Sequence, residues 1–64
     1  MFVKFTATDR VAVIVNATQV TYISEVSEGT RIRFGENRSV TVLEPLPEVM
    51  DRLDHTEQLP AGYA

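Results

Sequence analysis

The sequence predicts an α+β fold that is mostly β: a small antiparallel sheet or half-barrel of about five short strands, followed by one C-terminal amphipathic helix. Three observations predict this class. Short apolar runs, most of them alternating with polar residues, are separated by polar turns. The last run follows two prolines and repeats apolar residues at helical spacing instead. The composition, 44% apolar and 23% charged over 64 residues, is typical of an ordinary small globular domain.

The first two strands are predicted to pair as a hairpin. Residues 2–6 are predicted to form the first strand, and residues 8–10 (Thr-Asp-Arg) supply a polar turn. Residues 11–15 are all apolar and mostly β-branched, which is typical of a buried strand. Asn16 interrupts this run, and because its side chain can bond backbone groups just ahead of it, we expect a turn or a short helical loop there.

The third strand is predicted over residues 20–26. Ile23 is out of step with the other apolar residues of this run, which are Val20, Tyr22 and Val26. A regular strand would place alternate residues on one face, so we expect a β-bulge or a twist here.

The fourth and fifth strands show the clearest alternation. After a turn in which Gly29 can take a positive φ, Thr30, Ile32 and Phe34 alternate with Arg31 and Arg33, so that one face is apolar and the other cationic. A polar turn at residues 35–38 leads to a fifth strand at residues 39–42, where valines alternate with Ser39 and Thr41.

The helix is predicted over residues 47–55. Pro47 suits its first position because the missing N–H would have no partner there, and the Glu48 carboxylate favours the positive end of the helix dipole. The stripe predicted to pack on the sheet is Leu46, Val49, Met50 and Leu53, and the residues predicted to face water are Glu48, Asp51, Arg52 and Asp54. We therefore expect residues 1–56 to form a single β-rich domain that includes this helix, and residues 57–64 to be a flexible tail.

Charge and cysteine content narrow the class of protein. The net charge of −3 disfavours nucleic acid as a partner, because nucleic-acid-binding modules usually carry a basic excess. The absence of cysteine excludes disulfides and thiolate metal sites. No apolar run is long enough for a signal peptide or a membrane span, so we expect a cytoplasmic protein.

The sequence shows no recognisable catalytic machinery. His55 is the only histidine, so histidine-rich metal sites and nucleophilic triads lack their parts. Asp51 and His55, with Asp54 and Glu57 nearby, are the minimum for a weak divalent-ion site or an acid–base pair, but a solvated helix end explains them as well. The other acidic residues, Asp9, Glu25, Glu28, Glu36 and Glu44, are scattered over turns and strand ends and are interpreted as solubilising charges. We therefore predict that the protein is not an enzyme and uses no cofactor.

A row of arginines is the best candidate for a partner-binding site. Arg31 and Arg33 project from the same side of one strand, and Arg38 or Lys4 can extend the row. Such a row suits phosphate or the carboxylates of a partner. The alternative is a solvated sheet face whose arginines pair across the strands with Glu25 or with threonines. The aromatic residue of this strand points to the opposite face, so the stacking platform of single-strand binders is expected to be missing.

The later strands and the start of the helix together resemble a known family. The segments that carry the resemblance are residues 16–23, 29–32, 40–44 and 48–49. They are similar to the small flagellar accessory proteins called FlbD or SwrD, over most of the chain up to Leu53. The resemblance implies a compact β-rich protein with a C-terminal helix, a flagellar association and no known catalytic residues.

Two features depart from the pattern of that family. Pro45 stands where the family commonly has the serine of a capping box, although Glu48 keeps the place of the glutamate. Asp9-Arg10 stands where the first hairpin of the family often has Asn-Gly. A similar pattern of strands and helix start also occurs in the longer LytTR class of DNA-binding domains.

Three classes of function stay open. A chain this short buries only about 60% of the surface that its unfolded form exposes, so self-association is the expected reinforcement. The favoured class is a non-enzymatic interaction module that forms homo-oligomers and binds an unidentified protein partner. The second is a nucleic-acid-binding or regulatory module that uses Arg31 and Arg33. The third is small-ligand binding at a subunit interface.

Overall fold

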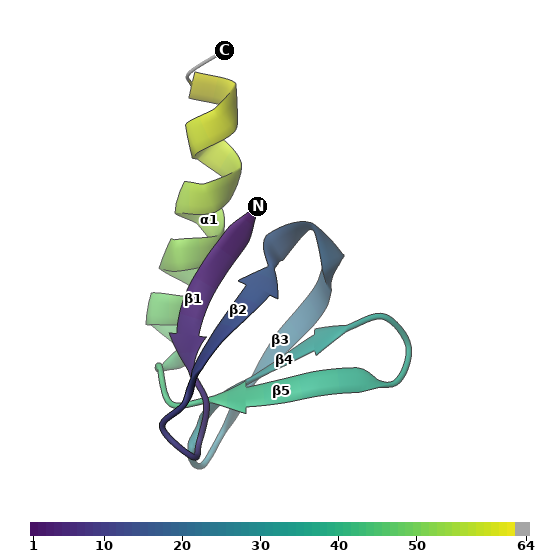
Figure 1. Ribbon diagram of the computed structural model, residues 1–64, viewed down its shortest axis with the longest axis vertical. Coiled ribbons are helices and arrows are strands. Elements are labelled where there is room, and N and C mark those ends of the chain that lie inside the picture. Colours follow the sequence, from purple (N-terminus) through teal and green to yellow (C-terminus); the bar gives the residue numbers. More distant parts are fainter. Residues whose placement is uncertain (63–64) are drawn as a thin grey trace.

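The computed structural model describes the backbone of residues 1–62 and the side chains of residues 1–54. It confirms the predicted α+β class, with five short strands and one C-terminal helix. In chain order the elements are β1 (Phe2–Thr6), β2 (Ala12–Asn16), the 3₁₀ helix η1 (Ala17–Gln19), β3 (Val20–Val26), β4 (Gly29–Phe34), β5 (Arg38–Val42) and α1 (Leu46–Gly62). Figure 1 shows the β1–β2 hairpin lying across the three-stranded sheet of β3, β4 and β5, with α1 beside β1.

The two strands β1 and β2 pair antiparallel, as the sequence predicts. Val3 lies opposite Val15 and Phe5 opposite Val13. Val3, Phe5 and Val15 are buried, and Val13 packs against them. Every second residue of the hairpin therefore enters the core, because side chains of a strand alternate between its two faces.

The other face of this hairpin is open, which corrects the prediction that residues 11–15 form a buried strand. Ile14 is 61% exposed and Val11 is 58% exposed. Phe2, on the same outer face as Ile14, is 70% exposed. The strand is apolar on both faces, yet the described part of the chain covers only one of them.

The turn between β1 and β2 holds a strained residue. Arg10 has a φ of 71°, in the left-handed region that favours glycine. Asp9 supports the turn, because its carboxylate accepts a hydrogen bond from the Val11 N–H at 3.1 Å. The Asp-Arg sequence therefore forms a turn that a glycine would form with less strain.

The short loop after β2 is organised by Asn16, as predicted. Its side-chain oxygen accepts hydrogen bonds from the Thr18 N–H at 3.2 Å and from the Thr18 hydroxyl at 2.8 Å. Asn16 thereby caps η1, the single 3₁₀ turn that leads into β3.

β3, β4 and β5 form an antiparallel meander with β4 in the centre. Ile32 lies opposite Ile23 on one side and Val40 on the other. The expected bulge is confirmed, because the register shifts between Val20 and Tyr22. The extra residue lets Val20 and Ile23 both pack against the core, while Tyr22 points outward and is 56% exposed.

The two sheets join at one corner. Ala7 forms a bridge with Val42, and the Leu43 N–H donates to the Thr6 carbonyl at 2.8 Å. Gly29 lies against this corner: a Cβ atom at this position would stand 2.2 Å from the Val42 carbonyl oxygen. The space between the sheets holds the buried apolar residues Val3, Phe5, Val15, Ile32, Val42 and Val49.

The helix α1 begins at Leu46 and continues to Gly62, so the predicted end at His55 is wrong and the predicted start is one residue late. The Pro45 carbonyl accepts hydrogen bonds from the N–H groups of Glu48 and Val49, at 3.0 and 3.1 Å. The backbone of Pro45 thus starts the helix without a capping side chain. Residues 63–64 of the tail predicted at 57–64 lie outside the described residues, as do the side chains of residues 55–62.

Only part of the predicted helical stripe packs on the sheets. Val49 is fully buried and Leu53 packs against the core, but Met50 is 52% exposed. Arg52, predicted to face water, instead lies with its guanidinium carbon 5.5 Å from the centre of the Phe5 ring. The helix stands beside β1 (Figure 1). The side of the helix that carries Val49 and Arg52 therefore packs against the sheets, and Met50 is left exposed.

Candidate functional site

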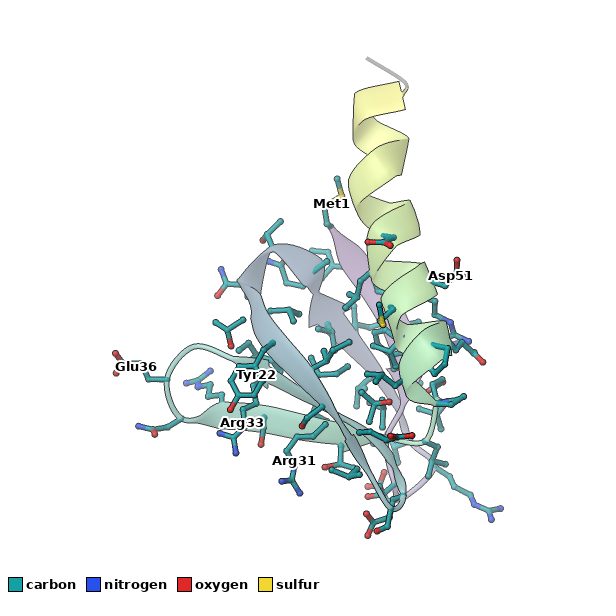
Figure 2. The ribbon with its side chains drawn as sticks, turned by 180° about the vertical axis from the view of Figure 1, so that it is seen from behind. Met1, Tyr22, Arg31, Arg33, Glu36 and Asp51 are labelled. Carbon is teal, nitrogen blue, oxygen red and sulfur yellow. The ribbon has the colours of Figure 1, made fainter. Side chains whose placement is uncertain are left out.

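Arg31 and Arg33 lie on the outer face of the three-stranded sheet, as the sequence predicts. Ile32 between them is fully buried, whereas both arginines are half-exposed. Figure 2 shows the two side chains extending away from the same side of the sheet. Their cross-strand neighbours on this face are Tyr22, Ser24, Ser39 and Thr41.

Tyr22 adds an aromatic ring to this face, which corrects the expectation that none lies among the arginines. It is paired with Arg33 in the register, and the Arg33 guanidinium carbon stands 5.7 Å from the centre of the Tyr22 ring. This is the distance of a cation–π contact. The position of Tyr22 could have been predicted from the sequence. Pairing residues antiparallel, outward from the tight turn after Val26, places Tyr22 opposite Arg33. We call Tyr22, Arg31 and Arg33 the arginine face.

The structure does not bring the other predicted cations to the arginine face. Arg38 lies opposite Phe34, so it shares the side of the sheet that Phe34 occupies and not the side of Arg33. Lys4 belongs to the other sheet, where it lies opposite Ile14. The candidate site therefore contains two of the three arginines named from the sequence.

The arginines of this face have no carboxylate partner in the described part of the chain. Neither Arg31 nor Arg33 forms an ion pair there. Glu25, a partner considered from the sequence, lies opposite Thr30 instead. The nearby Thr21 hydroxyl donates to the Arg33 carbonyl at 3.0 Å and leaves the guanidinium group to the tyrosine and to solvent.

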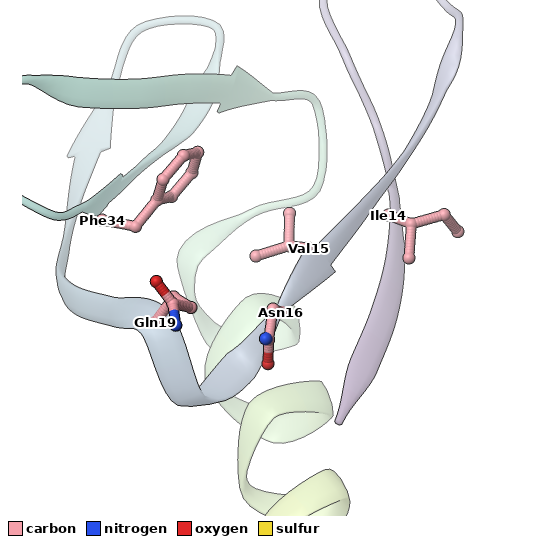
Figure 3. A pocket seen from close by; sticks show the side chains of 5 residues that line it. All are labelled: Ile14, Val15, Asn16, Gln19 and Phe34. Carbon is pink, nitrogen blue, oxygen red and sulfur yellow. The ribbon is translucent and has the colours of Figure 1, made fainter.

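A pocket with a volume of about 150 Å³ lies along β2, lined by Ile14, Val15, Asn16, Gln19 and Phe34. Figure 3 shows Val15 and Phe34 facing this space, while the Ile14 side chain lies on the other side of the β2 ribbon. Sites for small molecules usually have volumes of about 300–1,000 Å³. The pocket is too small for such a ligand, and it contains no charged side chain that would fix one.

Glu44 is held by several hydrogen bonds, which corrects its interpretation as a solubilising charge. Its side chain is only 12% exposed. Both carboxylate oxygens accept from the Thr6 N–H, at 3.0 and 3.1 Å, and its backbone carbonyl accepts from the buried Thr30 hydroxyl at 2.8 Å. Arg52 donates to the Glu44 carboxylate at 3.5 Å, to the Lys4 carbonyl at 2.8 Å and to the Glu48 carboxylate.

These contacts shift the acidity of Glu44. Burial raises its pKa, but the hydrogen bonds from Thr6 and from the Glu44 backbone, together with the positive charge of Arg52, outweigh burial and hold the pKa below its ordinary value. A carboxyl group kept ionised in this way is a structural anchor. It joins both sheets to the helix and is a poor proton donor or acceptor at neutral pH.

The helix carries the residues considered from the sequence for a weak ion site or an acid–base pair. The side chain of His55, and with it the pair considered with Asp51, lies outside the described residues. Among the described side chains, no three histidine, cysteine, aspartate or glutamate residues are close enough to hold an ion. No helix in the described part of the chain has the length and apolar character needed to cross a membrane.

Comparison of the chain with protein family models, with curated proteins and with solved structures finds no match.

Proposed function

We propose that this chain is a non-enzymatic interaction module that self-associates and binds a protein partner, with the arginine face as the partner-binding surface. The observation that supports this proposal is the grouping of Arg31, Arg33 and Tyr22 on one exposed sheet face with no carboxylate paired to either arginine in the described residues. Together with tryptophan, tyrosine and arginine are the residue types most enriched among the binding hot spots of protein interfaces.

The chemistry of the face indicates the kind of partner. Arginine forms bidentate hydrogen bonds with carboxylates, and a guanidinium already stacked on a ring loses less freedom on binding. A surface of the partner that carries aspartate or glutamate side chains therefore fits the arginine face best. The resemblance to small flagellar accessory proteins makes a component of the flagellar apparatus our proposed biological context.

The test is affinity capture with the purified chain from an extract of its native cells, followed by titration calorimetry with the purified captured protein. We expect the double variant Arg31→Ala/Arg33→Ala to weaken binding by at least about tenfold, since interface arginines of this kind commonly contribute more than about 1 kcal/mol. Arg38→Ala is the matched control, because Arg38 is exposed but lies on the other side of the sheet. Equal affinity of the double variant and the wild type would contradict the proposed surface.

A second candidate is a nucleic-acid-binding or regulatory module, favoured by the stacking of Arg33 on Tyr22. The net charge of −3 counts against it. Fluorescence anisotropy with a labelled single strand distinguishes the two candidates. Binding that weakens steeply with added salt and is lost in Arg31→Ala would favour nucleic acid over a protein partner.

A further inference from the structure

The outer edge of β2 presents backbone groups that nothing described pairs with. At the two ends of the hairpin, the Ala7 N–H donates to the Val11 carbonyl at 2.9 Å and the Ala17 N–H donates to the Met1 carbonyl at 2.7 Å. Hydrogen-bonding residues alternate along an antiparallel pair, so the even-numbered residues between these bonds direct their N–H and C=O groups away from β1. In the described chain β1 is the only strand that pairs with β2.

This edge has none of the features that normally block strand addition. From Val11 to Val15 it contains no charged residue and no proline, and its register with β1 is regular. Edge strands of stable monomers usually carry a charge, a proline or a bulge because an uncovered regular edge is a template for another strand. One of the two edge strands of the meander, β3, has both a bulge at Val20/Tyr22 and the charged Glu25.

The side chains next to this edge also lack cover. Phe2 and Ile14 share the outer face of the hairpin, with 70% and 61% of their surfaces exposed. On the inner side, the pocket formed by Val15 and Phe34 runs along the same edge (Figure 3). A strand added to β2 would continue the sheet past Ile14 and cover the pocket, so one partner would satisfy the backbone groups and pack against both Ile14 and the pocket.

We infer that β2 of one copy pairs antiparallel with β2 of a second copy, around a two-fold axis at Ile14, to form a continuous four-stranded sheet. The inference rests on the self-association included in the proposed function and assigns its interface. Pairing about Ile14 sets Val13 opposite Val15 and Ala12 opposite Asn16, so no like charges meet. A two-fold interface requires a surface that complements itself, and an uncharged strand centred on one isoleucine meets that requirement.

The absence of cysteine from the chain allows a direct test by disulfide trapping. In Ile14→Cys the two thiols meet at the two-fold axis, where hydrogen-bonded antiparallel partners have Cα atoms about 5.5 Å apart, within disulfide range. Tyr22→Cys is the matched control on the β3 edge, because Tyr22 and Ile14 are similarly exposed, at 56% and 61%. We expect mild oxidation to convert Ile14→Cys to covalent dimer at least about tenfold faster than Tyr22→Cys, since only the former is held at the interface.

A second pair of variants tests the same interface without oxidation. Ile14→Lys brings two ammonium groups together on the axis, and we expect it to raise the dimer dissociation constant, measured by sedimentation velocity, at least about tenfold. Tyr22→Lys is expected to leave it unchanged. Circular dichroism of both variants checks that the fold is retained.

The outcomes separate this inference from the proposed function. A wild-type dimer that is trapped through Ile14→Cys and weakened by Ile14→Lys supports the β2 interface. A dimer that is trapped or weakened by the Tyr22 variants, or by neither pair of variants, overturns the β2 interface but leaves self-association standing. A wild-type chain that stays monomeric at about 100 μM, above the dissociation constant of a specific dimer of ordinary strength, overturns both, and partner binding at the arginine face is then tested by itself.

Discussion

The β1–β2 hairpin and the meander of β3, β4 and β5 use the same alternation of side chains but differ in their outer faces. Each supplies the core through every second residue, as Phe5 and Ile32 show with 1% and 0% exposure. The outer face of the meander carries the arginine face and small polar residues, whereas that of the hairpin carries the exposed Phe2 and Ile14 beside Lys4. Alternation thus shows which residues point inward, and the chemistry of the remaining residues shows whether the other face suits water.

The largest expected effect separates inward from outward isoleucines. Ile32→Ala removes a fully buried side chain from the centre of the meander, and we expect it to lower the free energy of unfolding by about 2–5 kcal/mol. Ile14→Ala makes the same chemical change on the exposed face, with an expected loss below about 0.5 kcal/mol in the monomer. Urea denaturation at low micromolar concentration measures both.

Equal losses of stability in the two alanine variants would mean that Ile14 is covered within the monomer. That result would contradict the open outer face described for the hairpin. Ile32→Val, with an expected loss of about 0.5–1.5 kcal/mol, replaces Ile32→Ala if the latter does not fold.

The next largest effect concerns Glu44, which connects the hairpin to the meander. Glu44→Gln removes the charge that accepts from Thr6 and Arg52, and we expect a loss of about 1–2 kcal/mol at pH 7. Glu36→Gln, in the exposed turn between β4 and β5, is the matched control and is expected to change stability by less than about 0.5 kcal/mol.

The same residue gives the molecule an acid-sensitive contribution to stability. Because the folded-state pKa of Glu44 lies below its ordinary value of 4.5, the folded state favours the ionised form. Its contribution is complete well above pH 4.5 and is lost as the pH falls through 4.5 and the lower folded-state pKa. Urea midpoints measured between pH 7 and pH 3 should therefore fall less in Glu44→Gln than in the wild type, and parallel curves for the two proteins would contradict the assignment.

The smallest effect is confined to the hairpin. Arg10→Gly relieves the positive φ of 71° in the turn between β1 and β2, and we expect a gain of about 0.5–1 kcal/mol after the entropy lost by glycine is included. Gly35, with a φ of 68° in the other sheet, already has the residue that its turn favours. A loss of stability on the Arg10→Gly change, seen as a lower melting temperature, would show that the Arg10 side chain contributes more than its backbone strain costs.

Local patterns in the sequence were sufficient to predict the strands, the Asn16 turn and the bulge near Val20, because each depends on residues close together in the chain. The same patterns placed Arg31 and Arg33 on one face. They could not place Glu44 and Arg52, whose hydrogen bonds reach Thr6 and Lys4 in the first strand. These bonds depend on how the two sheets meet.

The corner where Thr6 meets Glu44 also has a consequence for the order in which the chain folds. The strands of the hairpin and of the meander pair with their neighbours in sequence, whereas this corner joins residues that are 38 positions apart. Closing so long a loop costs more conformational entropy than closing a hairpin turn. We expect the β1–β2 hairpin and the meander to form early, and we expect their docking at this corner to limit the rate of folding.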